Sequence, residues 1–484
     1  MRGRPWFVMT CFSVLVGGCS MAPDYQRPAA ELPDTWQAAP AQGQGVPAER
    51  WWTLFRDPAL DRLIDEALRN NQDLALATAR LDEARALARV ADAELMPAVG
   101  ATFQRNRSRF SDRTATPQPL NTPLESNTYR GQLNVAYEVD LWGRLRDSAK
   151  AAQAELLATT AARETVRITL TSAVVQSYYS LIAYDAQVDA TRRSLALRQS
   201  DLRLQRIRAD AGLINDFALR QLEAEVAAAQ GQLPALERNR TAEELILGVL
   251  LGRSPRALLQ ESVTRNAGDG TPVAPVVPPD LPSALLLRRP DIVTAEQQLI
   301  AANARIGAAR AALFPNIALT GYLGSESAEL ANLFSGPAAI WQIGFILAQP
   351  IFQGGRLFGE IEAVEARQRQ AIAQYQKTLQ TAFREAHDAL VTQVRAREAF
   401  DAETARAAAL TEALRLARIR FVNGLTSQLE VLDAERNLLS AELNRADALR
   451  AQRTAVANVV KALGGGWQGL DEQPQAAAAT SVPR

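Results

Sequence analysis

The chain has 484 residues, too many for one ordinary hydrophobic core, which indicates at least two structural units. Its 53 basic and 53 acidic side chains give a formal net charge of +0, so no charge excess points to nucleic acid or to an anionic lipid surface. Aromatic residues make up only 6% of the chain and alanine is abundant, a composition that favours long, closely packed helices.

The N-terminus has the layout of a secretory signal peptide. Arg2 and Arg4 precede an apolar run over residues 7–16, which is too short to cross a membrane as a helix. A Gly-Gly pair then precedes Cys19, and this ending resembles a bacterial lipobox. The resemblance implies a signal peptide over residues 1–18, cleavage before Cys19 and lipidation of that cysteine. An ordinary cleaved signal with an incidental cysteine is the alternative.

The residue after the lipobox sets the expected destination. Ser20 stands where an aspartate is associated with retention in the inner membrane, so we expect the lipidated chain in the outer membrane. Cys11 leaves with the signal peptide in this interpretation. The mature chain then holds one cysteine and no intrachain disulfide.

Two long stretches without proline predict very long helices. No proline occurs between Pro123 and Pro234, or between Pro350 and Pro474, and interior proline disrupts a helix. The first stretch has a seven-residue apolar repeat, typical of a coiled-coil seam, at Val174, Leu181, Val188, Leu195 and Leu202. A helix from about residue 149 to residue 210 would be about 90 Å long at roughly 1.5 Å per residue.

Two glycines predict that these helices reverse direction. Gly212 and Gly424 each follow Arg-Ile-Arg closely and each is followed by leucine, a polar patch and a new helical pattern. Glycine accepts the positive φ that ends many helices. The two glycines therefore predict the tips of two helical hairpins, and two unrelated glycine-terminated helices are the alternative.

Most of the chain is an internal repeat. The two tip glycines are 424 − 212 = 212 positions apart, "AELMPAVGATF" resembles "AALFPNIALTG", and "VDLWGRL" resembles "IFQGGRL". The predicted order is a signal peptide (1–18), a lipidated N-terminal segment (19–60), repeat one (61–267), a proline-rich linker (268–280), repeat two (281–467) and a flexible tail (468–484).

Each repeat contains a candidate pair of strands. Apolar and polar residues alternate in "GQLNVAYEVDLWG", and this period of two predicts hairpins over 98–112 with 129–141 and over 316–324 with 339–351. Strands of about ten residues suit a tilted membrane crossing, and a soluble sheet on a helical core is the alternative. Four strands cannot close a barrel, so membrane strands would require an oligomer.

Four segments carry a resemblance to a known family. They are "WWTLFRDPALDRLIDEALRNNQDL", "YEVDLWGRLR", "LLRRPDIVTAEQQLIAANARIGAARAALFP" and "KALGGGW". They resemble the TolC-like outer membrane factors, in the lipoprotein NodT-type branch that serves resistance-nodulation-division (RND) efflux pumps. The resemblance runs from Cys19 to about Trp467, and its third segment is the most specific.

The resemblance implies the fold and the partners. The implied fold is mainly α with a membrane β-barrel. Three chains with four strands each would form a twelve-strand barrel, and their coiled helical hairpins would form a periplasmic tunnel. The implied partners are two further copies of the chain, a periplasmic adaptor (membrane fusion) protein, an inner-membrane RND transporter and outer membrane lipid, with no nucleic acid.

The resemblance also implies site residues. Counted from Gly424, the family's pair of constricting acids falls on Glu430 and Asp433, which are three apart and share a helical face. Three copies would form two carboxylate rings that favour cations, and a solvated acidic face is the alternative. The expected adaptor-contacting tip residues are Arg208, Gly212, Leu213, Asn215, Asp216, Arg420, Phe421, Asn423, Gly424, Leu425, Thr426 and Ser427.

Two residues depart from the family pattern. Phe421 replaces a tyrosine and Ala218 replaces an aspartate, so the hydrogen bond that these groups make between neighbouring hairpins is lost. Charged Arg208, Asp216 and Arg420, with apolar side chains at both tips, are the candidates to hold a closed state instead.

The leading function is a passive exit duct for antibiotics and other small toxic compounds. A type I protein secretion duct and a non-channel coiled-coil lipoprotein are the alternatives. The chain has one histidine, His387, in a helical pattern, and no nucleophile–base set or metal-ligand spacing accompanies it. We therefore expect no catalytic residue, no metal and no cofactor.

Overall fold

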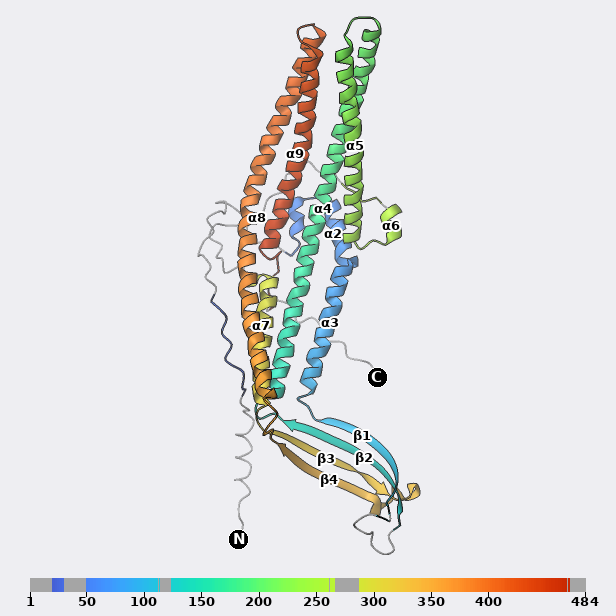
Figure 1. Ribbon diagram of the computed structural model, residues 1–484, viewed down its shortest axis with the longest axis vertical. Coiled ribbons are helices and arrows are strands. Elements are labelled where there is room, and N and C mark those ends of the chain that lie inside the picture. Colours follow the sequence, from blue (N-terminus) through green and yellow to red (C-terminus); the bar gives the residue numbers. More distant parts are fainter. Residues whose placement is uncertain are drawn as a thin grey trace. The chain divides into compact units, whose positions relative to one another are not determined.

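The computed structural model of the chain is shown in Figure 1. It describes residues 20–29, 49–111, 113, 123–260, 262–265, 287–467 and 469–470. The predicted signal peptide, the lipidation site Cys19 and the linker over 268–280 lie outside the described residues, as does nearly all of the predicted tail.

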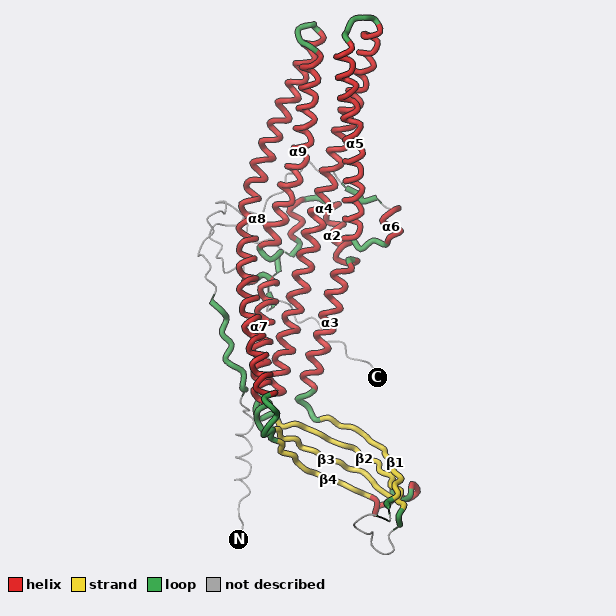
Figure 2. The backbone as a smooth tube through the Cα atoms, in the orientation of Figure 1, coloured by secondary structure: helices red, strands yellow, loops and turns green. Residues whose placement is uncertain are grey.

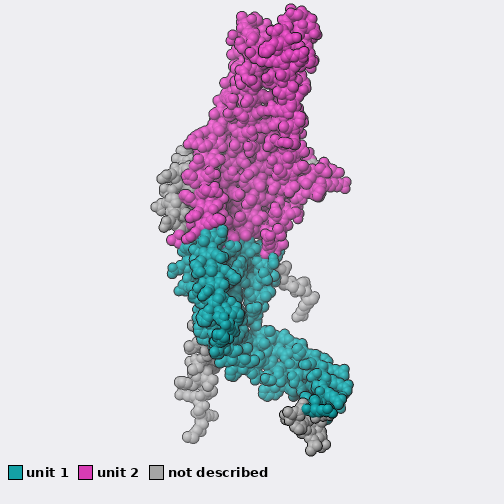
Figure 3. Space-filling view, viewed as in Figure 1, with its two compact units in different colours: residues 1–28, 81–159, 295–375 teal, residues 29–80, 160–294, 376–484 magenta. Residues whose placement is uncertain are grey.

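The chain divides into two compact units, coloured separately in Figure 3. Unit 1 comprises residues 1–28, 81–159 and 295–375, and unit 2 comprises residues 29–80, 160–294 and 376–484. Each unit takes segments from both halves of the sequence, so residues far apart along the chain build each core.

The helices show the internal repeat directly. Helices α4 (Arg144–Asp210) and α8 (Arg356–Val422) have 67 residues each, while α5 (Asp216–Leu250) and α9 (Gln428–Ala462) have 35 each. The structure also describes the shorter helices η1 (Trp51–Phe55), α2 (Pro58–Asn70), α3 (Gln72–Ala93), α6 (Pro255–Gln260), α7 (Pro290–Ala311), η3 (Leu330–Asn332) and η4 (Gly336–Ala338). The predicted seam is confirmed, because Val174, Leu181 and Val188 are fully buried.

One proline does not interrupt a helix as the sequence rule suggests. Helix α5 continues through Pro234, although proline lacks the N–H that would bond to the carbonyl four residues earlier. Both Pro234 and Gln230 are exposed. Water can therefore reach the carbonyl group that the proline leaves unpaired.

Unit 1 contains a four-stranded antiparallel sheet of order β1-β2-β3-β4, drawn in yellow in Figure 2. The strands are β1 (Ala98–Arg109), β2 (Glu125–Val139), β3 (Asn316–Ser327) and β4 (Ala339–Ala348). They lie where the alternation predicts strands. Strand β2 begins four residues earlier than expected, because Glu125 pairs with Arg109 at the end of β1.

The register separates an apolar face of the sheet from a polar one. Leu133 lies opposite Leu323, which lies opposite Trp341, and all three side chains are exposed in the single chain. The neighbouring row on the other face joins Asn134, Tyr322 and Gln342. An uncovered apolar row of this kind marks a surface that meets lipid or protein rather than water.

Among the described residues, no helix is both long enough and apolar enough to cross a membrane.

The N-terminal segment is fastened to the helices of unit 1. Ser20 Oγ donates to Asp147 Oδ1 on α4 at 2.9 Å, and Arg27 forms two hydrogen bonds with Glu296 on α7 at 2.6 and 2.9 Å. Gly307 on α7 makes this docking possible. A Cβ atom there would lie 2.1 Å from Asp147 Oδ2 and 2.7 Å from the backbone nitrogen of Ala22.

Unit 2 is built around the packing of η1 and α2 against α4 and α9. Trp51 and Trp52 are buried in one cluster with Val174 and Tyr178 of α4 and with apolar residues of α9. Asp57 caps α2 by accepting from the Ala59 N–H at 2.9 Å through Oδ1. Its Oδ2 accepts from the Tyr178 hydroxyl at 2.6 Å, which ties the cap to α4.

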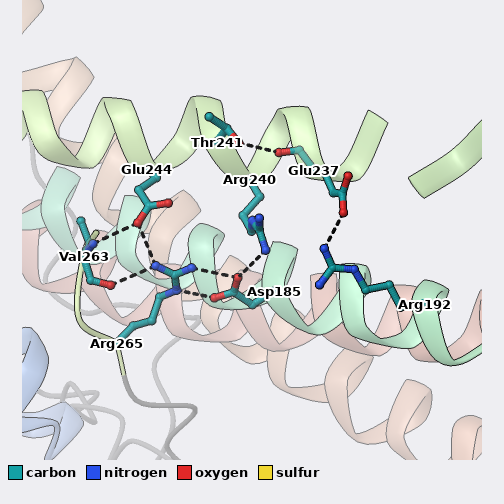
Figure 4. A network of polar contacts seen from close by, with 8 residues as sticks. All are labelled: Asp185, Arg192, Glu237, Arg240, Thr241, Glu244, Val263 and Arg265. Atoms are coloured by element: carbon teal, nitrogen blue, oxygen red, sulfur yellow. Dashed lines mark hydrogen bonds and ion pairs between the residues drawn. The ribbon is translucent and has the colours of Figure 1, made fainter. Parts of the chain in front are cut away.

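A charged network fastens the segment after α6 to the first helical hairpin (Figure 4). Arg265 bonds through Nε and Nη2 to Asp185 on α4, and its Nη1 donates to Glu244 on α5 at 3.0 Å. Glu244 also accepts from the Val263 N–H at 3.0 Å. The hydrogen bonds to Asp185 raise the pKa of Arg265, so its charge persists.

Candidate functional site

The two hairpin tips have the same backbone geometry. Gly212 and Gly424 have φ values of 70° and 72°, in the left-handed region that favours glycine. The Leu213 N–H donates to the Arg208 carbonyl and the Leu425 N–H to the Arg420 carbonyl, each at 2.8 Å. These bonds form the Schellman ending of α4 and of α8, which confirms both predicted reversals.

The helices that leave the two tips begin differently. Asn215 caps α5 by accepting from the Ala218 N–H at 2.9 Å, whereas Ser427 caps α9 without a side-chain hydrogen bond. The side chain of Asn423 turns back onto α8 and donates to the Ile419 carbonyl at 2.7 Å. The family pattern has an acid at position 218. Here the backbone N–H of Ala218 donates to the helix cap Asn215, and its side chain cannot form a hydrogen bond.

The tips present apolar and charged groups together. Leu213 and Leu425 are 72% and 69% exposed. Arg208, Asp216 and Arg420 form no ion pair with the part of the chain that the structure describes, so they do not join the two hairpins of one chain. Phe421 and Thr426 are half-buried. This surface suits a protein partner with complementary polar groups.

The two predicted constriction acids lie on the exposed face of α9. Glu430 and Asp433 are exposed, whereas the intervening Val431 and Leu432 are buried. Leu432 packs with Leu222 and other apolar residues of the first hairpin. The acids therefore point away from the contact between the two hairpins.

Asp433 has neighbours that the sequence analysis did not consider. Its Oδ1 accepts from Arg436 Nη2 at 2.6 Å, and its Oδ2 accepts from the Asn437 amide at 3.1 Å. Arg436 follows three residues later on the same helix, a spacing that predicts such a pair. Asp433 is thus partly compensated, while Glu430 has no hydrogen-bond or ion-pair partner among the described residues.

A second charged group, which sequence reasoning missed, lies between the hairpins. Glu435 on α9 is only 4% exposed and accepts from Arg418 Nη2 on α8 at 2.8 Å. Asp201 and Arg198 on α4 act on the same carboxylate. Arg198 also pairs with Glu225 on α5 at 3.0 Å, so all four hairpin helices contribute charges to this seam.

Burial raises the pKa of Glu435, Asp201 raises it further, and the hydrogen bond from Arg418 opposes the rise. Burial likewise raises the pKa of Asp201, against the attraction of Arg418. The seam near the tips therefore contains two carboxyl groups that protonate more readily than free ones.

The equivalent pair in the first hairpin is in a different environment. Arg206 and Glu223 precede Arg418 and Glu435 by 212 positions and bond across the hairpin at 3.0 Å. Glu223 also accepts from Arg220, and these two hydrogen bonds lower its pKa. The repeat thus keeps a cross-hairpin Arg–Glu pair in both copies but buries the acid in the second copy alone.

The comparisons with known proteins agree with this geometry. The chain matches the outer membrane efflux protein family over residues 63–253 and 281–465. It is 36% identical over 460 residues to the outer membrane protein OprJ of Pseudomonas aeruginosa, covering 94% of each chain. It is 33% identical over 464 residues to the cation efflux system protein CusC of Escherichia coli O157:H7, covering 95% of this chain and 98% of that protein.

Solved structures show the same architecture. The CmeC outer membrane channel of Campylobacter jejuni superposes with a TM-score of 0.87 at 26% identity, covering 93% of this chain and 95% of that one. The solved structure of CusC gives a TM-score of 0.81 at 32% identity, covering 93% of this chain and 100% of that one.

The sheet with one apolar face and the doubled helical hairpins are the parts of an outer membrane channel with a helical tunnel. The chain belongs to the outer membrane efflux protein family. The predicted fold class, mainly α with a membrane β-barrel and a periplasmic tunnel, is confirmed, and so are the outer membrane location and the role as an efflux channel. The family is one of transport ducts that serve tripartite pumps.

Proposed function

We propose that the chain is the exit duct for small amphipathic compounds, such as antibiotics and solvents, in an RND-type pump. Relatives carry cargo-specific names: the toluene efflux pump protein TtgC of Pseudomonas putida is 35% identical over 480 residues. The acidic side chains of Glu430 and Asp433 would filter the cargo weakly by charge. The width of the duct would filter it weakly by size. The transporter would provide the main selectivity and the energy.

The proposed assembly is a homotrimer anchored through lipidated Cys19. The exposed apolar row of the sheet supports it, because four strands leave two edges that lipid does not tolerate. Three sheets would close one twelve-strand barrel, and the three copies of each tip would meet the periplasmic adaptor. Two observations support this docking role: Leu213 and Leu425 are exposed, and Arg208 and Arg420 form no ion pair with the described residues.

One observation carries the proposed constriction: Glu430 and Asp433 are exposed on one face of α9, away from the contact between the hairpins. Three copies of this face around one axis would form two carboxylate rings. Such rings concentrate cations and repel anions in a narrow pore.

Conductance in a planar bilayer tests the constriction. The wild-type channel should show a small, cation-preferring conductance, and Glu430→Ala/Asp433→Ala should raise the conductance or abolish the preference. A matched control, Glu398→Ala/Asp388→Ala, removes two exposed acids of α8 and should leave both quantities unchanged. Equal ion preference in the wild type and the test variant would show that these acids do not line the constriction.

A further inference from the structure

The apolar face of the sheet ends before the strands do. The row that joins Leu133, Leu323 and Trp341 is followed, toward the connection between β1 and β2, by a row that contains Phe103. The next position on the same face of β1 is Arg105, because side chains alternate along a strand. This end of the sheet is the one far from the helices, since β1 begins after α3 and β2 ends before α4 (Figure 1).

Aromatic side chains mark the boundary of the apolar band. Phe103 and Trp341 are 64% and 72% exposed, and Tyr129 lies opposite Arg105 on the neighbouring strand. Membrane barrels carry such aromatic residues at the level of the lipid headgroups. The helical tunnel of these channels lies in the periplasm, so the end of the sheet far from the helices faces the outer leaflet of the membrane.

Three arginines follow on this face of β1, with one carboxylate beside them. Glu125 lies opposite Arg109 in the register, but its carboxylate bonds to Arg107 at 2.7 Å and offsets that charge. The guanidinium of Arg105 lies 5.6 Å from the ring centroid of Tyr129, a contact that orients the cation without neutralising it. Arg105 and Arg109 are exposed and form no ion pair with the part of the chain that the structure describes. Three positive charges thus meet one negative charge.

The positive charge is confined to one face and one end of the sheet. In the adjacent row, on the polar face, Arg130 of β2 forms an ion pair with Glu326 of β3. At the other end of the apolar face, the row of Val139, Ile317 and Leu347 carries no charge. An apolar surface that continues into cations at headgroup depth suits an anionic amphiphile better than a soluble anion.

We propose that Arg105 and Arg109 form a binding site for an anionic lipid of the outer leaflet whose headgroup bears two phosphate groups. Their Cα atoms are about 13 Å apart at roughly 3.3 Å per residue, so each guanidinium meets a separate phosphate. Guanidinium and phosphate form paired, charge-assisted hydrogen bonds. The acyl chains lie along Phe103 and the apolar band. The inference rests on the proposed assembly of the sheet into a barrel, and not on the cargo or the constriction.

The test is native mass spectrometry of the purified full-length protein in a neutral detergent, which resolves the trimer and each bound lipid. Diphosphoryl lipid A is the probe, and monophosphoryl lipid A and phosphatidylethanolamine are the comparison lipids. The diphosphoryl lipid should bind about tenfold or more tightly than the monophosphoryl lipid, the effect expected for one charged hydrogen-bonded contact. Inorganic phosphate at the same concentration should not displace it, which distinguishes a lipid site from a phosphate site.

Variants of single arginines locate the site. Arg105→Gln and Arg109→Gln should each weaken binding of diphosphoryl lipid A about tenfold. Arg105→Lys/Arg109→Lys keeps both charges and should stay within severalfold of the wild type. Arg130→Gln is the matched control, because it removes an arginine from the adjacent row on the other face of the sheet. It should bind the lipid like the wild type.

The trimer peak and the lipid peaks separate two kinds of failure. Intact trimers that bind the three lipids equally would overturn the lipid site alone. So would an unchanged affinity in Arg105→Gln/Arg109→Gln, or an equal loss of affinity in Arg130→Gln. A wild type that forms no trimers would overturn the proposed assembly, and the lipid site with it.

Discussion

The carboxylate of Asp433 has a positively charged neighbour, which offsets part of its negative charge. Arg436 donates to it at 2.6 Å, and both side chains are more than half exposed. We predict that Arg436→Gln strengthens the cation preference of the channel, because a positive charge beside each Asp433 is lost. The measurement is the reversal potential under a salt gradient, compared with the wild type.

The control for this change is Arg395→Gln, which breaks an equally exposed pair with Glu398 three residues away on α8. It should leave the reversal potential at the wild-type value. A decrease in cation preference for Arg436→Gln would contradict the proposed position of Asp433 in the pore.

Gly307 controls the docking of the N-terminal segment through the absence of a side chain. We predict that Gly307→Val displaces residues 20–29, because the new side chain would overlap Asp147 and the backbone of Ala22. Chymotrypsin should then cut after Tyr25 severalfold faster, as measured by mass spectrometry of the released peptide. Gly231→Val, at a helical glycine with open space, is the control and should cut at the wild-type rate.

Among the elements, the seam between the two hairpins responds to pH through Glu435. Its raised pKa means that the packed seam binds this proton more readily than the unfolded chain does. The stabilisation is complete below the ordinary glutamate pKa of about 4.3 and is lost as the pH rises through the raised value. We predict that Glu435 raises the melting temperature of the wild type more at about pH 5 than at neutral pH. The other carboxyl groups add their own pH dependence, which the variant below shares.

Glu435→Gln should flatten this dependence, because the amide keeps an acceptor for Arg418 but does not titrate. Glu223→Gln is the matched control in the first hairpin. The pKa of Glu223 is lowered, so its small contribution is present at neutral pH and is lost as the pH falls. Identical melting profiles for Glu435→Gln and the wild type would show that the seam does not titrate through this residue. Histidine titration adds little to the melting profile in this pH range, because the chain has one histidine.

The second tip depends on the left-handed backbone conformation of Gly424. We predict that Gly424→Val impairs efflux, because a β-branched residue in the left-handed region costs about 1–2 kcal/mol and reshapes the tip. The open space around Gly424 excludes a steric clash as the cause. Gly424→Asn, which tolerates this conformation, should retain most drug resistance in a growth assay. Equal resistance for both variants would count against adaptor docking at this tip.

At the scale of the whole molecule, the periodicity of the sequence predicted where helices and strands lie. It did not predict which side chains of different elements contact one another. The seven-residue repeat located the buried seam at Val174 and Leu181, and the period of two located the strands. Each pattern repeats along one element: the first follows the buried side of a helix, and the second follows the two faces of the sheet. Helix α5 passing Pro234 was not predictable in this way, since it depends on local solvent access.

The candidate site also contains residues that the sequence indicates and residues that only the contacts between helices show. Glu430 and Asp433 are proposed as constriction residues from their distance to Gly424 and from the family resemblance. Glu435 could not be predicted, because nothing in "QLEVLDAER" says which acid faces the other hairpin. Two of the charges that act on its carboxylate, Asp201 and Arg198, lie more than two hundred positions away in the sequence. Arg265 and its partners were missed for the same reason.

The fusion of two copies in one reading frame has a consequence for how such a channel can evolve. In a ring of six identical hairpins, every substitution would appear six times around the axis. In the proposed trimer of doubled chains each substitution appears three times, and the alternate hairpins keep the ancestral residue. Arg206–Glu223 and Arg418–Glu435 differ in this way: the acid is half-buried in the first copy and buried in the second. In the proposed trimer, neighbouring hairpins can therefore carry this Arg–Glu pair in different surroundings without any change in the spacing of the ring.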